Sequence, residues 1–325
     1  MLPTPSSPPV IHKVTPGYQR PLWSVMIPVY NCGPFLKETL ESVLVQAPDT
    51  ENMEIEVVDD ASMDIDVQAL VNEIGKGRIK YFRQEQNVGS LRNFATCINR
   101  SRGIYIHLLH GDDKVKEGYY KKIEQLFEKY PDAGAAFTRF RCINEVGSKI
   151  YEKTPEMYRE GILPNWLLKI GEHQRIQYAA ITVKREVYEK LGAFYGITYA
   201  EDWEMWVRIA SNYSFAYTPE ILAEYRKHQE SITGSKIING ENISDLLKAM
   251  MLIQKHLPQD QKKKILKRSR KYYAAYALKT AKSLWDRLHD KDIVHTQVKQ
   301  ALHLYQSPKL YLMVLKLYLL LKLER

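Results

Sequence analysis

The sequence is poor in cysteine and glycine, with only three and 16 of these among its 325 residues. Cys32, Cys97 and Cys142 are widely spaced and form no Cys-x-x-Cys pair, which argues against a disulfide framework, a zinc site and a redox centre. The glycines form neither a G-x-G-x-x-G run nor a P-loop, so a dinucleotide or P-loop site is not indicated. We therefore expect a protein of a reducing compartment.

Long apolar runs are also missing. The most apolar stretch, SPKLYLMVLKLYLLLKLER (307–325), is interrupted by Lys316 and Lys322, so its apolar core falls short of the ~20 residues that a membrane-spanning helix needs. The first 21 residues are rich in proline and serine, do not resemble a secretory signal, and predict a poorly ordered arm. Hydrophobic residues make up 45% of the chain, which is enough for a sizeable core.

Charge is distributed unevenly. Residues 235–325 carry 19 Lys and Arg against seven Asp and Glu, which leaves 28 against 31 for residues 1–234. This split predicts a flexible arm (1–21), a near-neutral front domain (22–234) and a basic helical C-terminal extension (235–325). We expect the final stretch to form a helix in a membrane interface, with Tyr311 and Tyr318 at headgroup level. Packing on its own domain or on a second subunit is the alternative.

Strand and helix signals alternate in the front domain. Apolar runs at 23–29, 53–60, 78–84 and 103–109 predict strands, and helical periodicity falls at 33–46, 65–74, 90–101 and 114–130. This series predicts an α/β fold with a mostly parallel sheet and helices on both faces. Ligands of such sheets bind at the carboxyl ends of the strands, so the loops there are the candidate site.

Four of these loops carry polar clusters: PVYN (28–31), VDDAS (58–62), QNVGSLRN (86–93) and HGDD (110–113). Each cluster taken singly also suits an ordinary turn, helix cap or surface. Four in successive strand-end loops would converge on one place. An aromatic face, an acid for hydroxyl or N–H groups, an arginine and a metal-binding acid pair suit a nucleotide diphosphate whose phosphates are held through a cation.

In order and spacing, these motifs resemble those of family 2 glycosyltransferases, which have a GT-A fold, over about residues 22–234. The resemblance implies transfer of a sugar from a nucleotide-diphosphate sugar to a hydroxyl acceptor, with inversion of configuration. It also implies a set of donor-binding residues: Pro28, Val29, Tyr30, Asp60, Asn87, Arg92 and Asp112. The run NVGSLRN departs from the commonest family form by being two residues shorter between Gly89 and Arg92.

The acids of HGDD correspond to the D-x-D region of the family, which binds Mn²⁺ or Mg²⁺ at the diphosphate of the donor. The resemblance therefore makes Asp112 and Asp113 metal ligands, with the alternative that one acid coordinates the metal while its neighbour binds ribose or sugar hydroxyls. It adds His228, because EYRKHQESITG (224–234) is similar to the YRxHxxS ending of the family. His110 stands where the fullest motif has an acid. Its imidazole would suit Mn²⁺ better than Mg²⁺, but a hydrogen-bonded histidine near a strand end explains it equally well, so we leave it out of the metal set.

A second acid cluster, YAEDWEMWVRIA (199–210), resembles the ED motif of the family. The resemblance makes Asp202 the catalytic base, which takes the proton of the acceptor hydroxyl, and lets Glu201 orient the acceptor. Capping of a helix N-terminus would favour an acid here as well. The QxxRW signature of processive synthases is missing after this motif, so a single sugar transfer is favoured over polymer synthesis. The acceptor pocket is expected within 154–194.

The resemblance favours UDP as the nucleotide, with dTDP and GDP as alternatives, and a sugar or lipid-linked hydroxyl as acceptor. The expected setting is cytoplasmic, at the inner face of a membrane, in cell-surface polysaccharide or glycolipid assembly. Because of His110, a catalytically inactive nucleotide-sugar-binding or scaffold protein is a second hypothesis. The run KKKILKRSRKYY (262–273) raises a third, a nucleic-acid-binding protein, but basic charge beside a Leu-rich helix fits a membrane better, and we expect no nucleic-acid partner.

Overall fold

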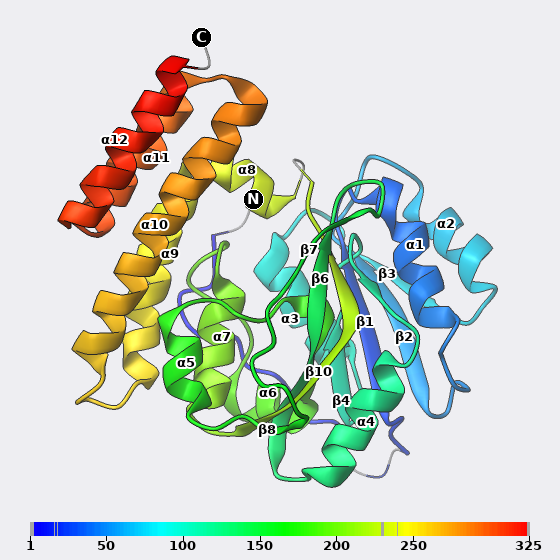
Figure 1. The fold of residues 1–325 in the computed structure, drawn as a ribbon. Coiled ribbons are helices and arrows are strands. Elements are labelled where there is room, and N and C mark those ends of the chain that lie inside the picture. Colours follow the sequence, from blue (N-terminus) through cyan, green and yellow to red (C-terminus); the bar gives the residue numbers. More distant parts are fainter. Residues whose placement is uncertain (1–2, 16, 18, 229–230, 239, 324–325) are drawn as a thin grey trace. The chain divides into compact units, whose positions relative to one another are not determined.

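The structure, a computed structural model, describes residues 3–15, 17, 19–228, 231–238 and 240–323 (Figure 1). The chain divides into two compact units. The first unit comprises residues 1–166, 176–198 and 212–227, and the second comprises 167–175, 199–211 and 228–325. This division differs from the expected boundary at residue 234, because residues 167–175, 199–211 and 228–234 of the predicted front domain belong with the C-terminal helices.

The first unit is built around a sheet, which has ten strands among the residues that the structure describes. Its strands are β1 (Trp23–Val29), β2 (Met53–Asp59), β3 (Lys80–Arg83), β4 (Tyr105–Leu108), β5 (Lys114–Val115), β6 (Ala133–Ile143), β7 (Lys149–Glu152), β8 (Gly161–Ile162), β9 (Ile181–Lys184) and β10 (Ser214–Arg226). They are arranged in the order β3-β2-β1-β4-β9-β6-β10-β5, with β7 on β6 and β8 on β10.

Most of these strands point the same way. β1 to β4 are parallel neighbours, β9 is antiparallel to both β4 and β6, and β6 is parallel to β10. β6 and β10 therefore share the direction of β1 to β4, which confirms the predicted mostly parallel sheet. β1 and β2 are buried along their whole length, as expected for central strands covered on both faces, and this is why they read as apolar runs.

Helices of the first unit connect these strands: α1 (Gly33–Leu44), α2 (Val67–Gly75), α3 (Ser90–Arg100), α4 (Tyr119–Lys129) and α6 (Arg185–Leu191). α1 and α2 lead outward from β1 to β3, and α3 returns to β4 on the other side of β1. Because such crossovers are right-handed, α3 lies on the opposite face from α1 and α2, as Figure 1 shows. The strand order reverses between β1 and β4, and ligands of such sheets bind at that point.

The N-terminal segment is fixed to the first unit, although its composition predicts a poorly ordered arm. The carbonyl oxygens of Pro5 and Pro9 accept hydrogen bonds from the N–H groups of Gly196 (2.8 Å) and Ala193 (2.9 Å). The side chain of Ile11 is only 2% exposed. One apolar anchor and two backbone hydrogen bonds thus hold the segment, which proline-rich composition by itself does not reveal.

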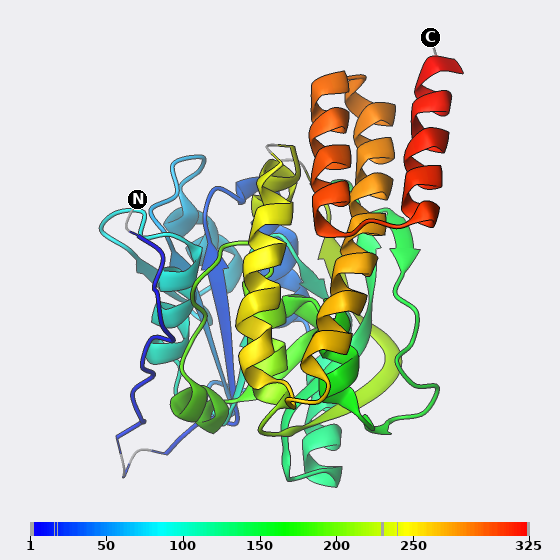
Figure 2. The same cartoon turned by 90° about the vertical axis from the view of Figure 1, so that its left-hand side faces the viewer.

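The second unit is helical. Its helices are α5 (Trp166–Glu172, without its first residue), α7 (Glu201–Ala210), α8 (Ile232–Ile238), α9 (Glu241–Ile253), α10 (Lys262–Leu288), α11 (Lys291–Leu304) and α12 (Pro308–Leu323). α10, α11 and α12 lie side by side in Figures 1 and 2, which agrees with the predicted helical extension. Within the described residues, no helix combines the length and the apolar character that crossing a membrane requires.

Local sequence explains how these helices pack. Ala274, Ala277 and Ala281 are completely buried on one side of α10, and their small side chains let neighbouring helices approach closely. α11 begins at an N-cap aspartate, Asp290, whose carboxylate accepts from the N–H groups of Asp292 (2.8 Å) and Ile293 (3.2 Å).

Candidate functional site

The loops that follow β1 and β4 pack against each other in the first unit. The N–H of Gly111 donates to the carbonyl oxygen of Pro28 at 3.3 Å. A Cβ atom at Gly111 would lie 2.6 Å from the sulfur of Cys32, so glycine is required here. Pro28 and Val29 are buried in β1, so their side chains belong to the core, whereas Tyr30 is 51% exposed. Only Tyr30 of these three predicted donor residues therefore presents its side chain to solvent.

Asp60 fixes the turn that begins α3. Its carboxylate oxygens accept from the N–H groups of Val88 (2.8 Å) and Gly89 (3.0 Å), and the side-chain oxygen of Asn87 also accepts from Gly89 (3.1 Å). Burial raises the pKa of Asp60 above its ordinary value, and the two N–H groups oppose that rise. The structure thus brings the predicted residues Asp60 and Asn87 together at the start of α3.

Arg92 lies in the first turn of the same helix. Its Nη2 donates to the carbonyl oxygen of Pro3 at 3.0 Å. Its Nε is buried and has no hydrogen-bond partner among the residues that the structure describes. A buried donor without a partner is rare in folded proteins. Arg92 therefore retains donor capacity that an anionic ligand could use.

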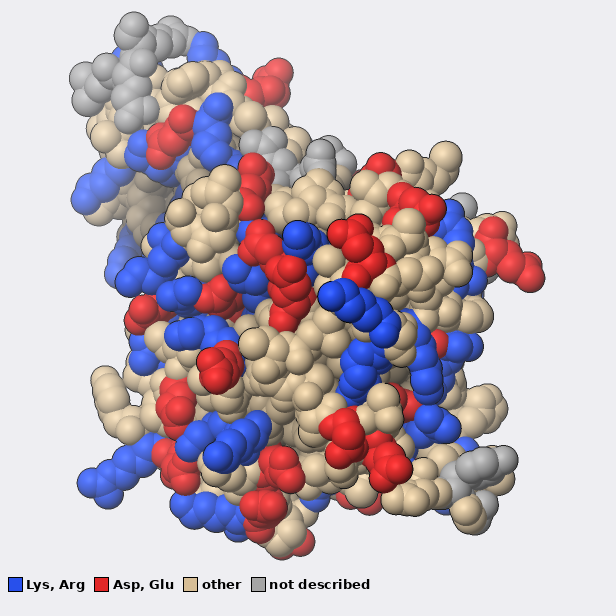
Figure 3. Space-filling model, turned by 90° about the vertical axis from the view of Figure 1, so that its right-hand side faces the viewer, with Lys and Arg blue, Asp and Glu red and all other residues tan. Residues whose placement is uncertain are grey.

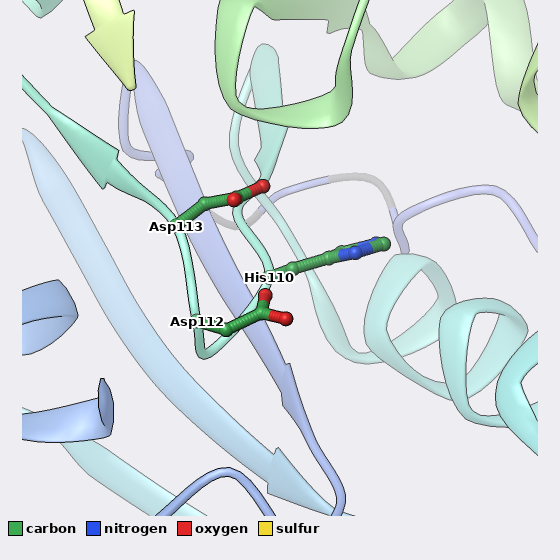
Figure 4. A group of neighbouring side chains, drawn as sticks. All are labelled: His110, Asp112 and Asp113. Atoms are coloured by element: carbon green, nitrogen blue, oxygen red, sulfur yellow. The ribbon is translucent and has the colours of Figure 1, made fainter. Parts of the chain in front are cut away.

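His110, Asp112 and Asp113 project to the same side of the loop after β4 (Figure 4). One ligand atom from each lies within 4.8 Å of those of the other two. Asp113 is 1% exposed, and its burial, followed by the neighbouring charge of Asp112, raises its pKa well above the ordinary value. A divalent cation would supply the positive charge that two adjacent carboxylates require, and carboxylate oxygen is a ligand type that such cations prefer. The group therefore fits a metal ion.

Arg226, the last residue of β10, holds this acid pair in place. Its backbone N–H donates to the carboxylate of Asp113, and its side-chain Nε donates to the carbonyl oxygen of Asp112, each at 2.9 Å. Its Nη2 donates to the carboxylate of Glu38 at 3.0 Å. From α1, the Thr39 hydroxyl donates to the carbonyl oxygen of Asp113 at 2.7 Å. Arg226 is the arginine of the YRxHxxS motif, but the resemblance assigns a role only to His228 of that motif.

Replacing Arg226 with methionine is expected to destabilise the first unit by about 3 kcal/mol, the lower end for breaking a buried ion pair, because its partner Glu38 is partly exposed. Urea unfolding followed by tryptophan fluorescence measures the change. The matched control is Lys149→Met at an exposed pair with Glu152, where less than about 0.5 kcal/mol is expected. Equal effects of the two substitutions would show that Arg226 is not the support described here.

His228, the third predicted metal ligand, is the first residue of the second unit. Its carbonyl oxygen accepts a hydrogen bond from the Ser231 hydroxyl at 2.8 Å. Gln229 and Glu230 of the same motif lie outside the described residues. The ligand role of His228 therefore stays a prediction.

The predicted base, Asp202, lies in the first turn of α7 in the second unit and is 9% exposed. One carboxylate oxygen is 2.6 Å from the N–H of Trp203, and the other accepts from the side-chain amide of Gln174. Burial, followed by the charge of Glu201, raises the pKa of Asp202 well above its ordinary value. The N-cap position is Ala200, so Asp202 is not the capping residue. A carboxylate whose proton affinity is raised in this way suits a general base.

The sequence gives no indication of Gln174 as a partner of Asp202, because Gln174 lies 28 residues away and belongs to no motif. Its N–H donates to the hydroxyl of Tyr273 in α10 at 3.0 Å. The indole N–H of Trp203 donates to the carbonyl oxygen of Ile170 at 2.6 Å, and its ring packs against Tyr273 with centroids 5.2 Å apart. These contacts within the second unit explain why residues 167–175 and 199–211 belong with the C-terminal helices.

Comparison with known sequences gives a consistent result. Residues 24–192 match the family model described as glycosyl transferase family 2. The chain is 28% identical over 250 residues to an uncharacterized protein of Mycobacterium tuberculosis, covering 70% of this chain and 73% of that protein. It is 27% identical over 211 residues to an uncharacterized glycosyltransferase of Methanocaldococcus jannaschii, covering 64% of this chain and 71% of the relative.

Solved structures of similar fold include a mannosyltransferase. Residues 1–349 of S. aureus TarS, in complex with UDP-GlcNAc, align with a TM-score of 0.64 at 17% identity, covering 87% of this chain and 81% of TarS 1–349. The mannosyltransferase PcManGT of Pyrobaculum calidifontis, in complex with GDP-Man and Mn²⁺, aligns with a TM-score of 0.53 at 18% identity, covering 93% and 88%. At such identities the likeness establishes the fold alone, and it confirms the predicted GT-A fold.

Proposed function

Because the chain belongs to glycosyltransferase family 2, we propose that it transfers one sugar per encounter from a nucleotide-diphosphate sugar to an acceptor hydroxyl, with inversion of configuration. The observation that carries the proposal is the group formed by His110, Asp112 and Asp113 at the carboxyl end of β4, beside the point where the strand order reverses. UDP is the favoured nucleotide, with dTDP and GDP as alternatives; TarS was solved with UDP-GlcNAc and PcManGT with GDP-Man.

In this proposal the first unit binds the donor. The exposed ring of Tyr30 offers a face to the base, and Asp60 and Asn87 lie at the nucleoside. The unpartnered Nε of Arg92 is a donor for the nucleotide. Asp112, Asp113 and His228 would hold Mn²⁺ or Mg²⁺, and such a cation stabilises the charge of the departing diphosphate.

Asp202 acts as the base. Its carboxylate takes the proton of the acceptor hydroxyl while the hydroxyl oxygen attacks the anomeric carbon and the nucleoside diphosphate leaves. One direct displacement inverts the configuration. Burial of Asp202 favours its protonated product state, which suits proton transfer in the transition state. Glu201, the first residue of α7, is proposed to orient the acceptor.

We also propose that the acceptor is a sugar or a lipid-linked sugar in cell-surface polysaccharide or glycolipid assembly, and that the enzyme works from the cytoplasmic side of a membrane. The supporting feature is α12. Leu310, Leu317 and Leu321 are buried on one side of this helix. The opposite side exposes about half of each of Leu312, Leu315 and Leu319. Exposed lysines accompany these leucines: Lys309, Lys316 and Lys322. Exposed leucines with flanking lysines fit an anionic lipid surface.

The double substitution Leu315→Asp, Leu319→Asp is expected to release the protein from vesicles that contain anionic lipid. Each aspartate removes an apolar anchor and adds repulsion, while high salt weakens only the attraction of the lysines. Vesicle flotation measures the bound fraction, and Val146→Asp, at an exposed apolar residue of the first unit, is the matched control. If the double variant stays on the vesicles and loses a dimer instead, α12 is a subunit contact and the membrane proposal fails.

Nucleic-acid binding has weaker support. On the face that Figure 3 shows, Lys and Arg side chains are interspersed with Asp and Glu side chains. Tracking a phosphate backbone is favoured by basic charge that acidic side chains do not interrupt. The basic excess belongs to residues 235–325, where it accompanies the exposed leucines of α12.

Calorimetric titration of UDP, dTDP and GDP in the presence of Mn²⁺ tests the donor assignment. Binding of one nucleotide that requires the cation supports the proposed function. Absence of binding by all three contradicts it. If binding occurs but no donor sugar is ever turned over, the inactive binding protein suggested by His110 is the better description.

A further inference from the structure

The imidazole of His110 is held in a fixed orientation. Its ring stacks on Phe94, with centroids 5.0 Å apart and planes inclined by 26°. On Tyr178 the centroid distance is 4.2 Å and the inclination 30°. Both aromatic residues are only 5% exposed, so the ring has little freedom to turn. Because this side chain is already fixed, it loses less conformational entropy when a ligand binds.

Stacking alone leaves His110 incompletely satisfied. Its Nε2 is shielded from solvent and has no hydrogen-bond partner among the described residues. A buried polar atom without a partner costs about 1–3 kcal/mol, so such an atom in a folded protein calls for an explanation. A ring nitrogen of His110 belongs to the same group as the carboxylate oxygens of Asp112 and Asp113, within 4.8 Å (Figure 4).

This spacing suits one shared cation. Bonds from divalent cations to nitrogen and oxygen ligands are about 2.0–2.2 Å long, so two ligand atoms of one ion lie at most about 4.4 Å apart. The upper bound of 4.8 Å in the group exceeds that distance by only a few tenths of an ångström. A small adjustment of the side chains would therefore complete an arrangement of one nitrogen and two carboxylate oxygens.

We propose that His110 is a direct ligand of the cation and makes the site select Mn²⁺ over Mg²⁺, an inference that rests on the metal-dependent function proposed above. Mg²⁺ demands oxygen ligands in nearly ideal octahedral geometry, whereas transition-metal ions accept imidazole nitrogen. An acid at this position would give a site made of oxygen alone, which suits both ions. The imidazole adds a ligand that only one of them uses well.

The test compares His110→Asn and His110→Asp with the full-length wild type, in the presence of UDP. In His110→Asn, Mn²⁺ affinity measured by electron paramagnetic resonance is expected to fall by about tenfold or more, while Mg²⁺ affinity measured by competition changes less than about twofold. In His110→Asp, the affinities for the two ions are expected to converge. Pulsed measurements on bound Mn²⁺ are made in a His228→Asn protein, which lacks the other proposed imidazole ligand. They should detect coupling to an imidazole nitrogen there and lose it when His110→Asn is added.

Unchanged Mg²⁺ affinity shows that His110→Asn is folded, and His12→Asn, at an exposed histidine of the first unit, should behave as the wild type. Nitrogen coupling that persists in the His228→Asn, His110→Asn double variant would assign the nitrogen to another residue and overturn the proposal. Equal losses for both ions in His110→Asn would overturn it too. If the wild type and the His228→Asn protein bind Mn²⁺ and UDP but His228→Asn shows no nitrogen coupling, only this inference fails. If it binds neither, the proposed function fails with it.

Discussion

Replacing Asp202 with asparagine is expected to lower sugar transfer by about 10²- to 10⁴-fold, the usual contribution of a general base. Asparagine keeps the shape of the side chain and can still accept the hydrogen bond from the Trp203 N–H, but it cannot take a proton. Donor binding is placed in the first unit, so nucleotide affinity should stay within about twofold of wild type. Steady-state kinetics and calorimetry measure the two quantities separately.

The matched control for this substitution is Asp260→Asn, at an exposed acid of the same unit, which should keep full activity. A pH profile gives a second check. A base works only when deprotonated, so the rate falls as pH drops through its pKa. Because burial raises the pKa of Asp202, that fall should begin well above the ordinary aspartate value of about 3.9. An active Asp202→Asn enzyme would refute the assignment.

Replacing Asp113 with asparagine is expected to weaken Mn²⁺-dependent nucleotide binding by about 100-fold or more, because even residues that only support metal ligands contribute 10- to 100-fold to affinity. The side-chain oxygen of asparagine can still accept from the N–H of Arg226, so the loop should keep its structure while the site loses one negative charge. Calorimetry with Mn²⁺ and UDP measures the change, and turnover should fall in parallel.

Asp132→Asn, at an exposed acid of the same unit, is the control for Asp113 and should leave nucleotide affinity unchanged. Nucleotide binding without Mn²⁺ gives a baseline, which Asp113→Asn should not lower. If the substitution leaves Mn²⁺-dependent binding intact, Asp113 is a structural acid of the loop and not a metal ligand.

The parallel half of the sheet could be predicted from the sequence because its signals are local. The apolar run at 23–29 coincides with β1, and the periodic segments at 33–46 and 90–101 contain α1 and α3. The position of β9 could not be predicted. It lies between β4 and β6 and is antiparallel to both, and such long-range pairing leaves no mark on a strand of four residues.

The division into units escaped prediction for a similar reason. The change in charge near residue 235 is real, but packing follows apolar contacts and not charge. Trp203 contacts Tyr273 within the second unit, although the two residues are far apart in the chain. Residues 199–211 therefore belong with the C-terminal helices, and composition gives no indication of it.

The same contrast between local signals and long-range contacts applies to the candidate site. Motif reasoning found Asp112, Asp113 and Asp202, because short patterns carry them. It gave no role to Arg226, the arginine of the YRxHxxS motif, because a motif does not show which carboxylate, here 113 residues earlier, that residue supports. Motif reasoning left His110 out of the metal set, because a motif records residue types. It does not show that the Nε2 of His110 is buried without a hydrogen-bond partner among the described residues.

Donor turnover measures the central claim most directly. Purified protein is mixed with UDP-, dTDP- and GDP-sugars in Mn²⁺, and release of nucleoside diphosphate is followed with and without a chelator. The account predicts slow hydrolysis of one donor in the absence of acceptor, abolished by the chelator, restored by Mn²⁺ and nearly lost in Asp113→Asn. Donor hydrolysis that is unaffected by the chelator, or no hydrolysis of any donor sugar, would contradict a metal-dependent glycosyltransferase built on the acids of the β4 loop.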